Sequence, residues 1–438
     1  MTATRDPIPV TVVSGSLGAG KTTLVNHLLS ETDRRLAVVV NDVGELNVDR
    51  ELVERRIEMA NSESEVYGLE SGCICCGLQG EFENELYRLA HDLEFDHLLV
   101  ESSGISEPAP IARTLSEPGP VGDLYGIDAM VTVVDAPRFL DAFGADSRPG
   151  RSGPDGSGVR PLSDLTIEQV EFCDVLVVNK RDRLSEVEME RAERLLRSLQ
   201  SDAALHWTEF GRIEPEKLLE SGSFDLERVH GSAGWKRAIE HHEAHAHGHD
   251  RDHGEAGEGD GVHDHEQGVH SHDHDDHLHP PETYGIDSFL YHRTRPFHPG
   301  RLLDWLREPP AGVVRWKGLL WVAGRDRYGF DLSGAGEVLR VSINGRWVAT
   351  LPSFQREAHR ERNPTMHWDE EWGDRENTLV FIGTDHDERV ITDALDGCLL
   401  TDGEMDTDWE AFENEFPRRP AEELVVDREE PEQASGPD

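Results

Sequence analysis

Residues 15–22 read GSLGAGKT, a glycine-rich segment that ends in a lysine and a hydroxyl-bearing residue. This is the complete G-x-x-x-x-G-K-[ST] pattern, in which backbone N–H groups wrap nucleotide phosphates, the lysine reaches the β- and γ-phosphates, and the hydroxyl ligates Mg²⁺. An apolar β-branched run precedes the segment and an amphipathic run follows it, which is the strand–turn–helix context that this chemistry requires. The predicted nucleotide contacts are Gly15, Gly18, Ala19, Gly20, Lys21, Thr22 and Thr23, and Thr22 is also a predicted Mg²⁺ ligand.

Residues 179–182 read NKRD and follow another apolar run. In an N-K-x-D segment the aspartate can accept hydrogen bonds from the N1–H and N2–H₂ groups of guanine, while the asparagine contacts the Hoogsteen edge. Adenine lacks that pair of donors, so the segment predicts GTP rather than ATP as the nucleotide. The residues expected at the base are Asn179, Lys180 and Asp182.

Acidic residues follow two further apolar runs. Glu101 ends the run LLVE, and an acid at such a strand end can hold Mg²⁺ through water or position the attacking water. Lys21 and Glu101 are therefore the candidate catalytic residues. Residues 41–45, NDVGE, follow the apolar run LAVVV and are predicted to form a switch segment that senses the γ-phosphate.

Three of the five cysteines, Cys73, Cys75 and Cys76, lie close together in the segment GCICCG. Five cysteines in 438 residues do not make a disulfide framework. Thiolates in C-x-C-C suit Zn²⁺ or another thiophilic metal, with one carboxylate or histidine to complete a tetrahedron. The segment therefore predicts a small metal site, and the alternative is a group of buried or merely reactive thiols.

Residues 240–281 form a low-complexity segment in which histidines alternate with acids and glycines. Such a segment has no apolar periodicity and cannot form a core. Its imidazoles could bind divalent ions weakly, without a strong choice among Zn²⁺, Ni²⁺, Co²⁺ and Cu²⁺, and the alternative is a tract without a selected role. The predicted ligands in this segment are His245, His247, His249, His270, His272 and His274.

The rest of the chain divides into two domains and a tail. Over residues 8–225, short continuous apolar runs alternate with helical segments, which predicts an α/β domain with a parallel sheet buried on both faces. A Gly/Pro/Ser-rich loop at residues 144–161 interrupts this domain. Residues 283–403 predict a smaller α+β domain, and residues 404–438 predict an acidic tail.

The formal net charge is −45, with acidic residues spread along the whole chain. We expect a solvated acidic surface adapted to high internal salt, as in halophilic microbes, and the alternative is a cationic partner. Nucleic-acid binding is disfavoured because phosphates require a basic patch. No apolar run approaches the ~20 residues of a membrane-spanning helix, and no signal peptide is recognisable, so we expect a cytoplasmic protein without a membrane partner.

The motifs GSLGAGKTTL, GCICC, ESSGISEP and NKRD occur in this order, and GIDSFLYHRTRPFHPGRL, RWKGLLWVAGR and LVFIG follow in the second half. The chain thereby resembles the CobW family of P-loop GTPases over nearly its whole length, except residues 144–161 and the tail. The resemblance implies a CobW C-terminal domain and a GTP-driven metal-insertion chaperone, most often for zinc. The family's usual N-E-F-G-E segment is NDVGE here, which retains Glu45 as a candidate metal ligand near the cysteines.

Together these features predict a slow, Mg²⁺-dependent GTPase whose nucleotide state controls the metal affinity of the C-x-C-C site. The expected cargo is Zn²⁺, with Co²⁺ or Ni²⁺ as alternatives, and the expected partner is a metal-requiring client protein recognised by the second domain. A homodimer is compatible with the sequence. Two alternatives stay open: a GTPase for cobalt insertion in cobalamin synthesis, and a non-catalytic metal buffer that stores ions on its histidines.

Overall fold

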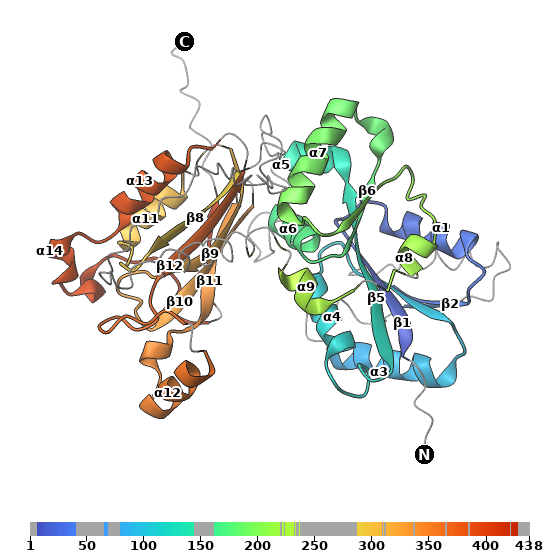
Figure 1. The fold of residues 1–438 in the computed structure, drawn as a ribbon, viewed down its shortest axis with the longest axis horizontal. Coiled ribbons are helices and arrows are strands. Elements are labelled where there is room, and N and C mark those ends of the chain that lie inside the picture. Colours follow the sequence, from blue (N-terminus) through green and yellow to red (C-terminus); the bar gives the residue numbers. More distant parts are fainter. Residues whose placement is uncertain are drawn as a thin grey trace, which may run out of the picture.

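The computed structural model shows two domains, each built on its own sheet (Figure 1). In the part of the chain that the structure describes, no helix is both long and apolar enough to cross a bilayer. The described residues are 7–40, 65–68, 79–143, 162–219, 221–222, 224–231, 233, 236, 287–308, 310, 312–335, 338–363, 366–383, 386–420 and 422–427.

The first domain contains a parallel sheet with the strand order β3-β2-β4-β1-β5-β6-β7 in its described residues. Strands β2, β4 and β6 are buried along their whole length, because their central residues are apolar and helices cover both faces of the sheet. The predicted α/β fold with a parallel sheet is therefore confirmed. The strands are β1 (Ile8–Ser14), β2 (Leu36–Val40), β3 (Glu65–Gly68), β4 (His97–Glu101), β5 (Tyr125–Asp135), β6 (Val175–Asn179) and β7 (Ala204–Trp207).

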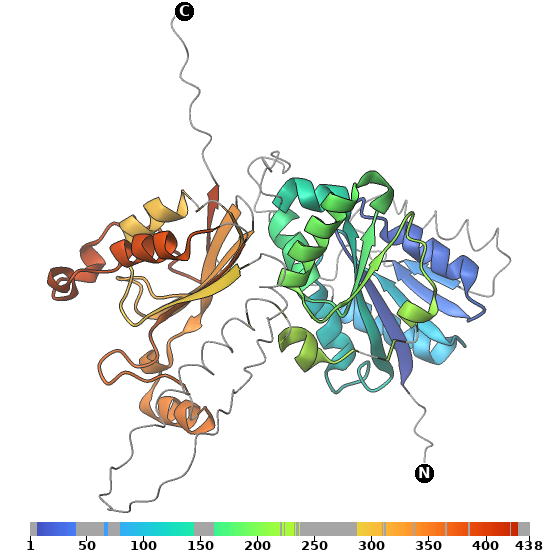
Figure 2. The ribbon, with the colours of Figure 1, turned by 45° about the horizontal axis from the view of Figure 1, so that its top comes forward.

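Helices lie on both faces of this sheet (Figures 1 and 2). Successive residues of β1 point to opposite faces, so Val12 lies in one core with Phe82 of α3, whereas Val13 lies in another with Leu24 and Leu28 of α1. The helices are α1 (Lys21–Glu31), α3 (Gln79–Asp92), α4 (Pro108–Ser116), α5 (Ala136–Phe143), α6 (Leu162–Glu171), α7 (Glu186–Leu199), α8 (Glu216–Leu219), α9 (Leu226–Gly231) and the 3₁₀ turn η2 (Arg181–Arg183).

The carboxyl ends of the strands in this sheet lie at one edge, because the neighbouring strands are all parallel. The register pairs Val13 of β1 with Glu101 of β4, and Asp135 of β5 with Asn179 of β6. Residues that follow these strands are therefore neighbours in space, although they are far apart in the sequence. This edge is where the phosphate loop lies.

The second domain is an antiparallel sheet with helices packed on one face, which confirms the predicted smaller α+β domain. Its strand order in the described residues is β13-β11-β10-β9-β12-β8. Helices α11 and α13 cover the face turned away from the first domain (Figure 1), where Leu302 and Leu395 join Trp316 and Phe381 in the core. The elements are β8 (Asp287–Arg293), α11 (Pro299–Leu306), β9 (Val313–Leu320), β10 (Tyr328–Ala335), β11 (Val338–Arg346), α12 (Ser353–Arg362), β12 (Asn377–Gly383), α13 (Glu388–Cys398), α14 (Asp402–Met405) and β13 (Glu423–Asp427).

The chain beyond residue 403 returns to this second sheet. Strand β13 pairs with β11, and the ring of Phe416 is 1% exposed in the core of the domain. The segment that we expected to be an acidic tail thus supplies an edge strand and a buried aromatic ring.

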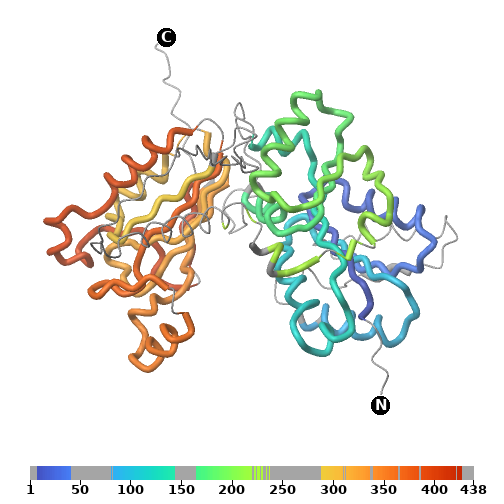
Figure 3. The backbone as a smooth tube through the Cα atoms, viewed as in Figure 1, coloured from blue at the N-terminus to red at the C-terminus, as the bar shows by residue number. Residues whose placement is uncertain are grey.

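The other face of the second sheet packs against the first domain. Val314 and Val380 of the second sheet lie in the same apolar core as Val134 and Ile167 of the first domain. Helix α6 is in contact with β10 at this boundary, and the tube in Figure 3 shows the two domains side by side. The two domains therefore share a continuous apolar core where they meet.

Candidate nucleotide-binding site

The phosphate loop connects the end of β1 to the start of α1 and requires glycine at particular positions. Gly15 and Gly20 have φ angles of 135° and 109°, in the region that residues with a Cβ rarely adopt. A Cβ on Gly15 would collide with the carbonyl group of Val133 in β5, and a Cβ on Gly20 would lie 2.5 Å from Nδ2 of Asn179. The loop is thus held tightly between the neighbouring strands.

Lys21, at the first position of α1, points back over the loop. Its Nζ donates to the carbonyl oxygens of Gly15 at 2.8 Å and Ser16 at 3.2 Å. The residue is 8% exposed, so most of its length is buried and its ammonium group stays at the loop. A phosphate oxygen at this position could replace either carbonyl as the acceptor of a charge-assisted hydrogen bond.

Thr22 and Glu101 come together beside this lysine. The Thr22 hydroxyl donates to Glu101 Oε1 at 2.7 Å, and Glu101 is 3% exposed at the end of β4. The sequence motifs predicted both residues separately, and the parallel pairing of β1 with β4 brings them into contact. A hydroxyl oxygen and a buried carboxylate next to a phosphate loop are the oxygen donors that Mg²⁺ prefers, so these two side chains fit that ion.

Asn179 joins the phosphate loop to the loop that follows β7. Its Nδ2 donates to the carbonyl oxygen of Ala19 at 2.9 Å, while its Oδ1 accepts from the Thr208 hydroxyl at 3.1 Å and from the Gly211 N–H at 3.0 Å. The amide is buried, with 2% of the residue exposed. In this structure, therefore, one buried amide connects these two loops.

Lys180 makes a second connection to the phosphate loop. Its φ angle of 64° is unusual for a residue with a side chain, and its Nζ donates to the Gly18 carbonyl at 2.7 Å and to Asp135 Oδ2 at 2.5 Å. Asp182 lies in the short turn η2 with an exposed side chain, and Thr23 is exposed in the first turn of α1. The two sequence motifs predicted to bind phosphate and base therefore lie in direct contact.

Three residues of this site were not predicted from the sequence. Asp135 ends β5 and binds Lys180, while Thr208 and Gly211 follow β7 and bind Asn179. The sequence does contain a signal for Asp135, because this acid ends an apolar run, and residues at the ends of such strands lie near the phosphate loop. The segment TEFG after β7 carries no comparable pattern.

The predicted metal ligands, apart from Thr22, lie outside the described residues. They are Glu45, Cys73, Cys75, Cys76, His245, His247, His249, His270, His272 and His274. Among the residues that are described, no group of three or more His, Cys, Asp or Glu side chains is arranged to hold a metal ion.

The two described cysteines belong to the hydrophobic cores. Burial raises the pKa of the Cys173 thiol far above its usual range, and burial raises that of Cys398 to about 11. Both thiols therefore stay protonated near neutral pH. A protonated, buried thiol is a poor metal ligand, so neither residue is a candidate for the metal site.

Sequence comparisons place both domains in known families. Residues 9–206 match the CobW/HypB/UreG nucleotide-binding domain, and residues 286–399 match the cobalamin synthesis protein cobW C-terminal domain. The chain is 31% identical over 422 residues to the zinc-regulated GTPase metalloprotein activator 1 of Dictyostelium discoideum, covering 91% of this chain and 81% of that protein. This chain is a member of the CobW family.

Other relatives of this CobW protein match part of the chain. The zinc chaperone CobW of Pseudomonas aeruginosa is 36% identical over 188 residues, which are 40% of this chain and 50% of that protein. Among solved structures, the Zn(II)-bound YjiA GTPase from E. coli aligns with 90% of this chain and 100% of its own, at 18% identity and a TM-score of 0.38. The match to the CobW nucleotide-binding domain includes the phosphate loop, Glu101 and the NKRD segment, so this CobW protein carries the P-loop GTPase domain of its family.

Proposed function

We propose that this protein is a GTP-hydrolysing metallochaperone that carries a divalent metal, in the first place Zn²⁺, to a metal-requiring client protein. The observation that carries the proposal is the contact of Thr22 with Glu101 beside an intact phosphate loop. These two oxygen donors fit the Mg²⁺ ion on which GTP hydrolysis depends, and they occur in a chain whose relatives include proteins named zinc chaperones.

At the phosphate end, each residue has a distinct role. Lys21 would exchange the carbonyl oxygens of Gly15 and Ser16 for phosphate oxygens, which it is already positioned to reach. Thr22 and Glu101 would hold Mg²⁺, which when bound supplies charge neutralisation at the β- and γ-phosphates. Glu101, buried at the strand end, would also orient the attacking water. Catalysis would then consist of positioning and electrostatic stabilisation.

At the base end, Asp182 is exposed and can accept hydrogen bonds from the N1–H and N2–H₂ groups of guanine. Asn179 connects the phosphate loop to the loop after β7, and Lys180 binds the phosphate loop at Gly18, so the base and phosphate motifs are held together. The carboxylate of Asp182, which can accept from a pair of donors that adenine lacks, supports GTP as the nucleotide.

The proposed metal ligands follow two strands of the sheet that carries the phosphate loop. Cys73, Cys75 and Cys76 follow β3 in the sequence, and Glu45 follows β2. Strands β3, β2 and β4 pair in parallel, so the ends of β2 at Val40 and of β3 at Gly68 lie at the edge that carries the phosphate loop. A change in the γ-phosphate at that edge could therefore change the metal affinity of the cysteines.

The test is the Zn²⁺ affinity of the full chain, measured by competition with a chelator in the presence of GTP–Mg²⁺, of GDP, and of no nucleotide. We expect the affinity to differ several-fold between GTP and GDP, and Cys75→Ser to abolish the tight site. The matched control replaces His270, His272 and His274 with asparagine, which should remove only weakly bound ions.

Two outcomes would contradict the proposal. Equal Zn²⁺ affinity in every nucleotide state would exclude coupling, because thermodynamic linkage requires the effect to be reciprocal. Loss of the tight site in the histidine variant, but not in Cys75→Ser, would favour the metal-buffer alternative. Repeating the titration with Co²⁺ addresses the cobalt-insertion alternative.

A further inference from the structure

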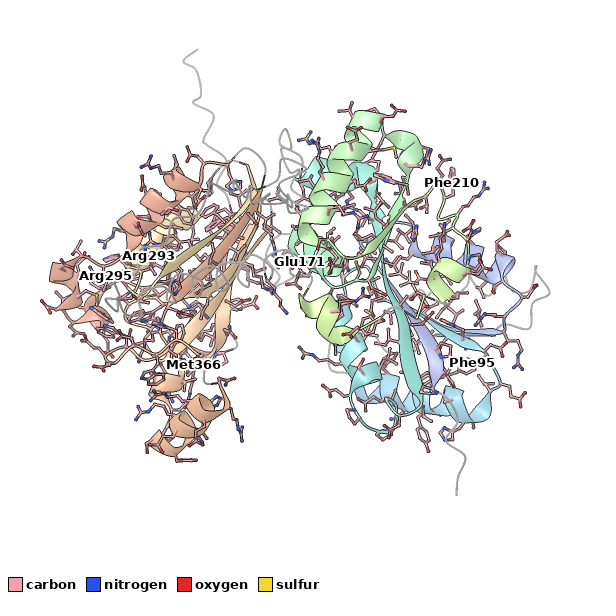
Figure 4. All side chains as sticks on the ribbon, in the orientation of Figure 1. Phe95, Glu171, Phe210, Arg293, Arg295 and Met366 are labelled. Carbon is pink, nitrogen blue, oxygen red and sulfur yellow. The ribbon has the colours of Figure 1, made fainter. Side chains whose placement is uncertain are left out.

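A buried ion cluster lies where helix α6 of the first domain meets the second sheet. Arg315 of β9 is 0% exposed, and its guanidinium makes two parallel hydrogen bonds to Glu171, at 2.8 Å and 2.9 Å. The same guanidinium lies 3.3 Å from Asp164 Oδ1, and Arg340 of β11 lies 3.2 Å from Asp164 Oδ2. Figure 4 shows Glu171 at the boundary between the domains. Two carboxylates of α6 are thus bound by arginines of the second domain.

These charges fix α6 against the second domain with defined geometry. Burial acts to lower the pKa of Arg315, but the carboxylates of Glu171 and Asp164 raise it above its usual range, so the guanidinium stays charged. A bidentate arginine–carboxylate pair away from water constrains both distance and orientation. A movement of the second domain therefore moves α6.

Between its two charged ends, α6 carries Gln169, which faces the interior of the first domain. Gln169 is 0% exposed, and its Nε2 donates to the carbonyl oxygen of Ser106 at 3.1 Å. Its backbone carbonyl accepts from the Thr132 hydroxyl of β5 at 2.7 Å. Within the described residues, Oε1 of Gln169 has no hydrogen-bond partner.

Ser106 belongs to the segment 102–107, which directly follows Glu101 and leads into α4. This segment packs on the phosphate loop, because a Cβ on Gly104 would lie 2.7 Å from the backbone nitrogen of Leu17. Ser102 is tied to β1 by its N–H, which donates to the Val13 carbonyl at 2.9 Å. The hydrogen bond from Gln169 thus reaches the segment that directly follows Glu101 and packs on the phosphate loop.

We propose that Gln169 is a positioning residue for GTP hydrolysis, and that the second domain acts through it by holding α6 with Arg315. The inference rests on the proposed GTPase function and adds that the second domain sets the hydrolysis rate. The path runs from Arg315 to Glu171 and Asp164, along α6 to Gln169, and from Gln169 to Ser106 and the segment after Glu101. A displacement of α6 by about 1 Å would break the 3.1 Å contact, and misplacement on that scale can cost up to about 100-fold in rate.

The test uses the full chain and separates the hydrolysis step from nucleotide binding. Single-turnover hydrolysis at saturating GTP gives the rate, and a fluorescent GDP analogue gives the affinity. In Gln169→Met and in Arg315→Met, we expect the rate to fall roughly tenfold to 100-fold while the GDP affinity stays within about twofold. Backbone hydrogen exchange of residues 102–107 should become faster in both variants, which tests the contact of this segment independently of the hydrolysis rate.

The control is Arg301→Met. Arg301 makes a similar bidentate pair with Glu404, at 2.9 Å and 2.8 Å, but within the second domain and away from α6. The hydrolysis rate of Arg301→Met should equal that of the unaltered protein. Because Arg315→Met leaves buried carboxylates without their partner and could prevent folding, the double variant Arg315→Met, Glu171→Met replaces the pair by apolar side chains and must show the same loss of rate.

Each outcome decides a separate question. An unchanged rate in Gln169→Met overturns the positioning role, and an unchanged rate in the folded Arg315 variants overturns the role of the second domain. A fall in GDP affinity with an unchanged rate would make α6 a purely structural element and would also overturn the inference. If the unaltered chain binds GTP but does not hydrolyse it, the proposed function fails first and the inference fails with it.

Discussion

The side chain of Asn179 joins two loops of the nucleotide site, and replacing it with alanine should separate them. Three hydrogen bonds would be lost: one to the carbonyl of Ala19, one from the Thr208 hydroxyl and one from the Gly211 N–H. Because Asn179 is 2% exposed, water cannot replace these bonds unless the loops open. At about 1 kcal/mol for each net hydrogen bond, Asn179→Ala is expected to lower the free energy of unfolding by about 3 kcal/mol.

Two measurements check this expectation. Urea unfolding without nucleotide gives the loss of stability, and fluorescent guanine nucleotides give the effect on the site. GTP and GDP should both bind more weakly by a similar factor, because Asn179 holds the loops and does not contact the γ-phosphate. The loss of about 3 kcal/mol limits this weakening to about 100-fold in Kd.

Asp182→Asn is the matched control, because Asp182 is exposed three residues further along the chain and makes none of these contacts. Its stability should equal that of the unaltered protein. If Asn179→Ala unfolds at the same urea concentration as the control, the hydrogen bonds of Asn179 do not hold the loops and the reasoning is refuted. Weaker binding of GTP alone, with GDP unaffected, would also contradict it.

Three further predictions concern the base, the metal ligand and a buried histidine. Asp182→Asn should weaken the binding of GTP and strengthen the binding of xanthosine triphosphate in a nucleotide competition assay. The reason is that an amide can donate to the O2 atom of xanthine, at the position where guanine carries an amino group. Unchanged selectivity would exclude a role of Asp182 in binding the base. Thr22→Val should weaken Mg²⁺-dependent GTP binding several-fold, because it removes one of the two oxygen donors proposed for the ion; a titration equal to that of the unaltered protein would remove Thr22 from the site. His97 is buried against Thr11, and burial lowers its pKa from 6.5 to about 4, so the unfolded chain binds this proton first as the pH falls. Lowering the pH from 7 to 5 should therefore reduce the free energy of unfolding of the unaltered protein by about 2 kcal/mol more than that of His97→Gln, as measured by urea unfolding. Equal reductions in the two proteins would contradict the neutral state of His97.

The parts of the site that sequence alone predicted are those whose chemistry depends on local spacing. Gly15 to Thr22 form a contiguous loop, so the pattern itself determines the glycine positions and the place of Lys21. Glu101 lies 79 residues from Thr22, and the contact between them exists because β1 and β4 are parallel neighbours. That contact could be anticipated, since apolar runs that end in polar residues place those residues at one edge of a parallel sheet.

The parts that could not be predicted depend on remote partners. Arg315 lies in the run VVRWKGLL and resembles any exposed arginine of a strand, and its burial follows only when the domains pack. Gln169 carries no motif, since its role depends on where the carbonyl of Ser106 lies. The acidic composition after residue 403 concealed the apolar residues of β13 and Phe416, which the sheet needs at its edge and in its core.

The ion cluster around Arg315 also has a consequence for how such proteins can recombine. In the sequence, the histidine-rich segment 240–281 separates the domains and looks like the natural point at which to exchange them between relatives. A chimera joined there would place Asp164 and Glu171 opposite a foreign strand, with no arginine assured to neutralise them. A chimera should therefore take the second domain and helix α6 from the same parent protein. In particular, the residues at positions 164, 171 and 315 should all come from that one parent.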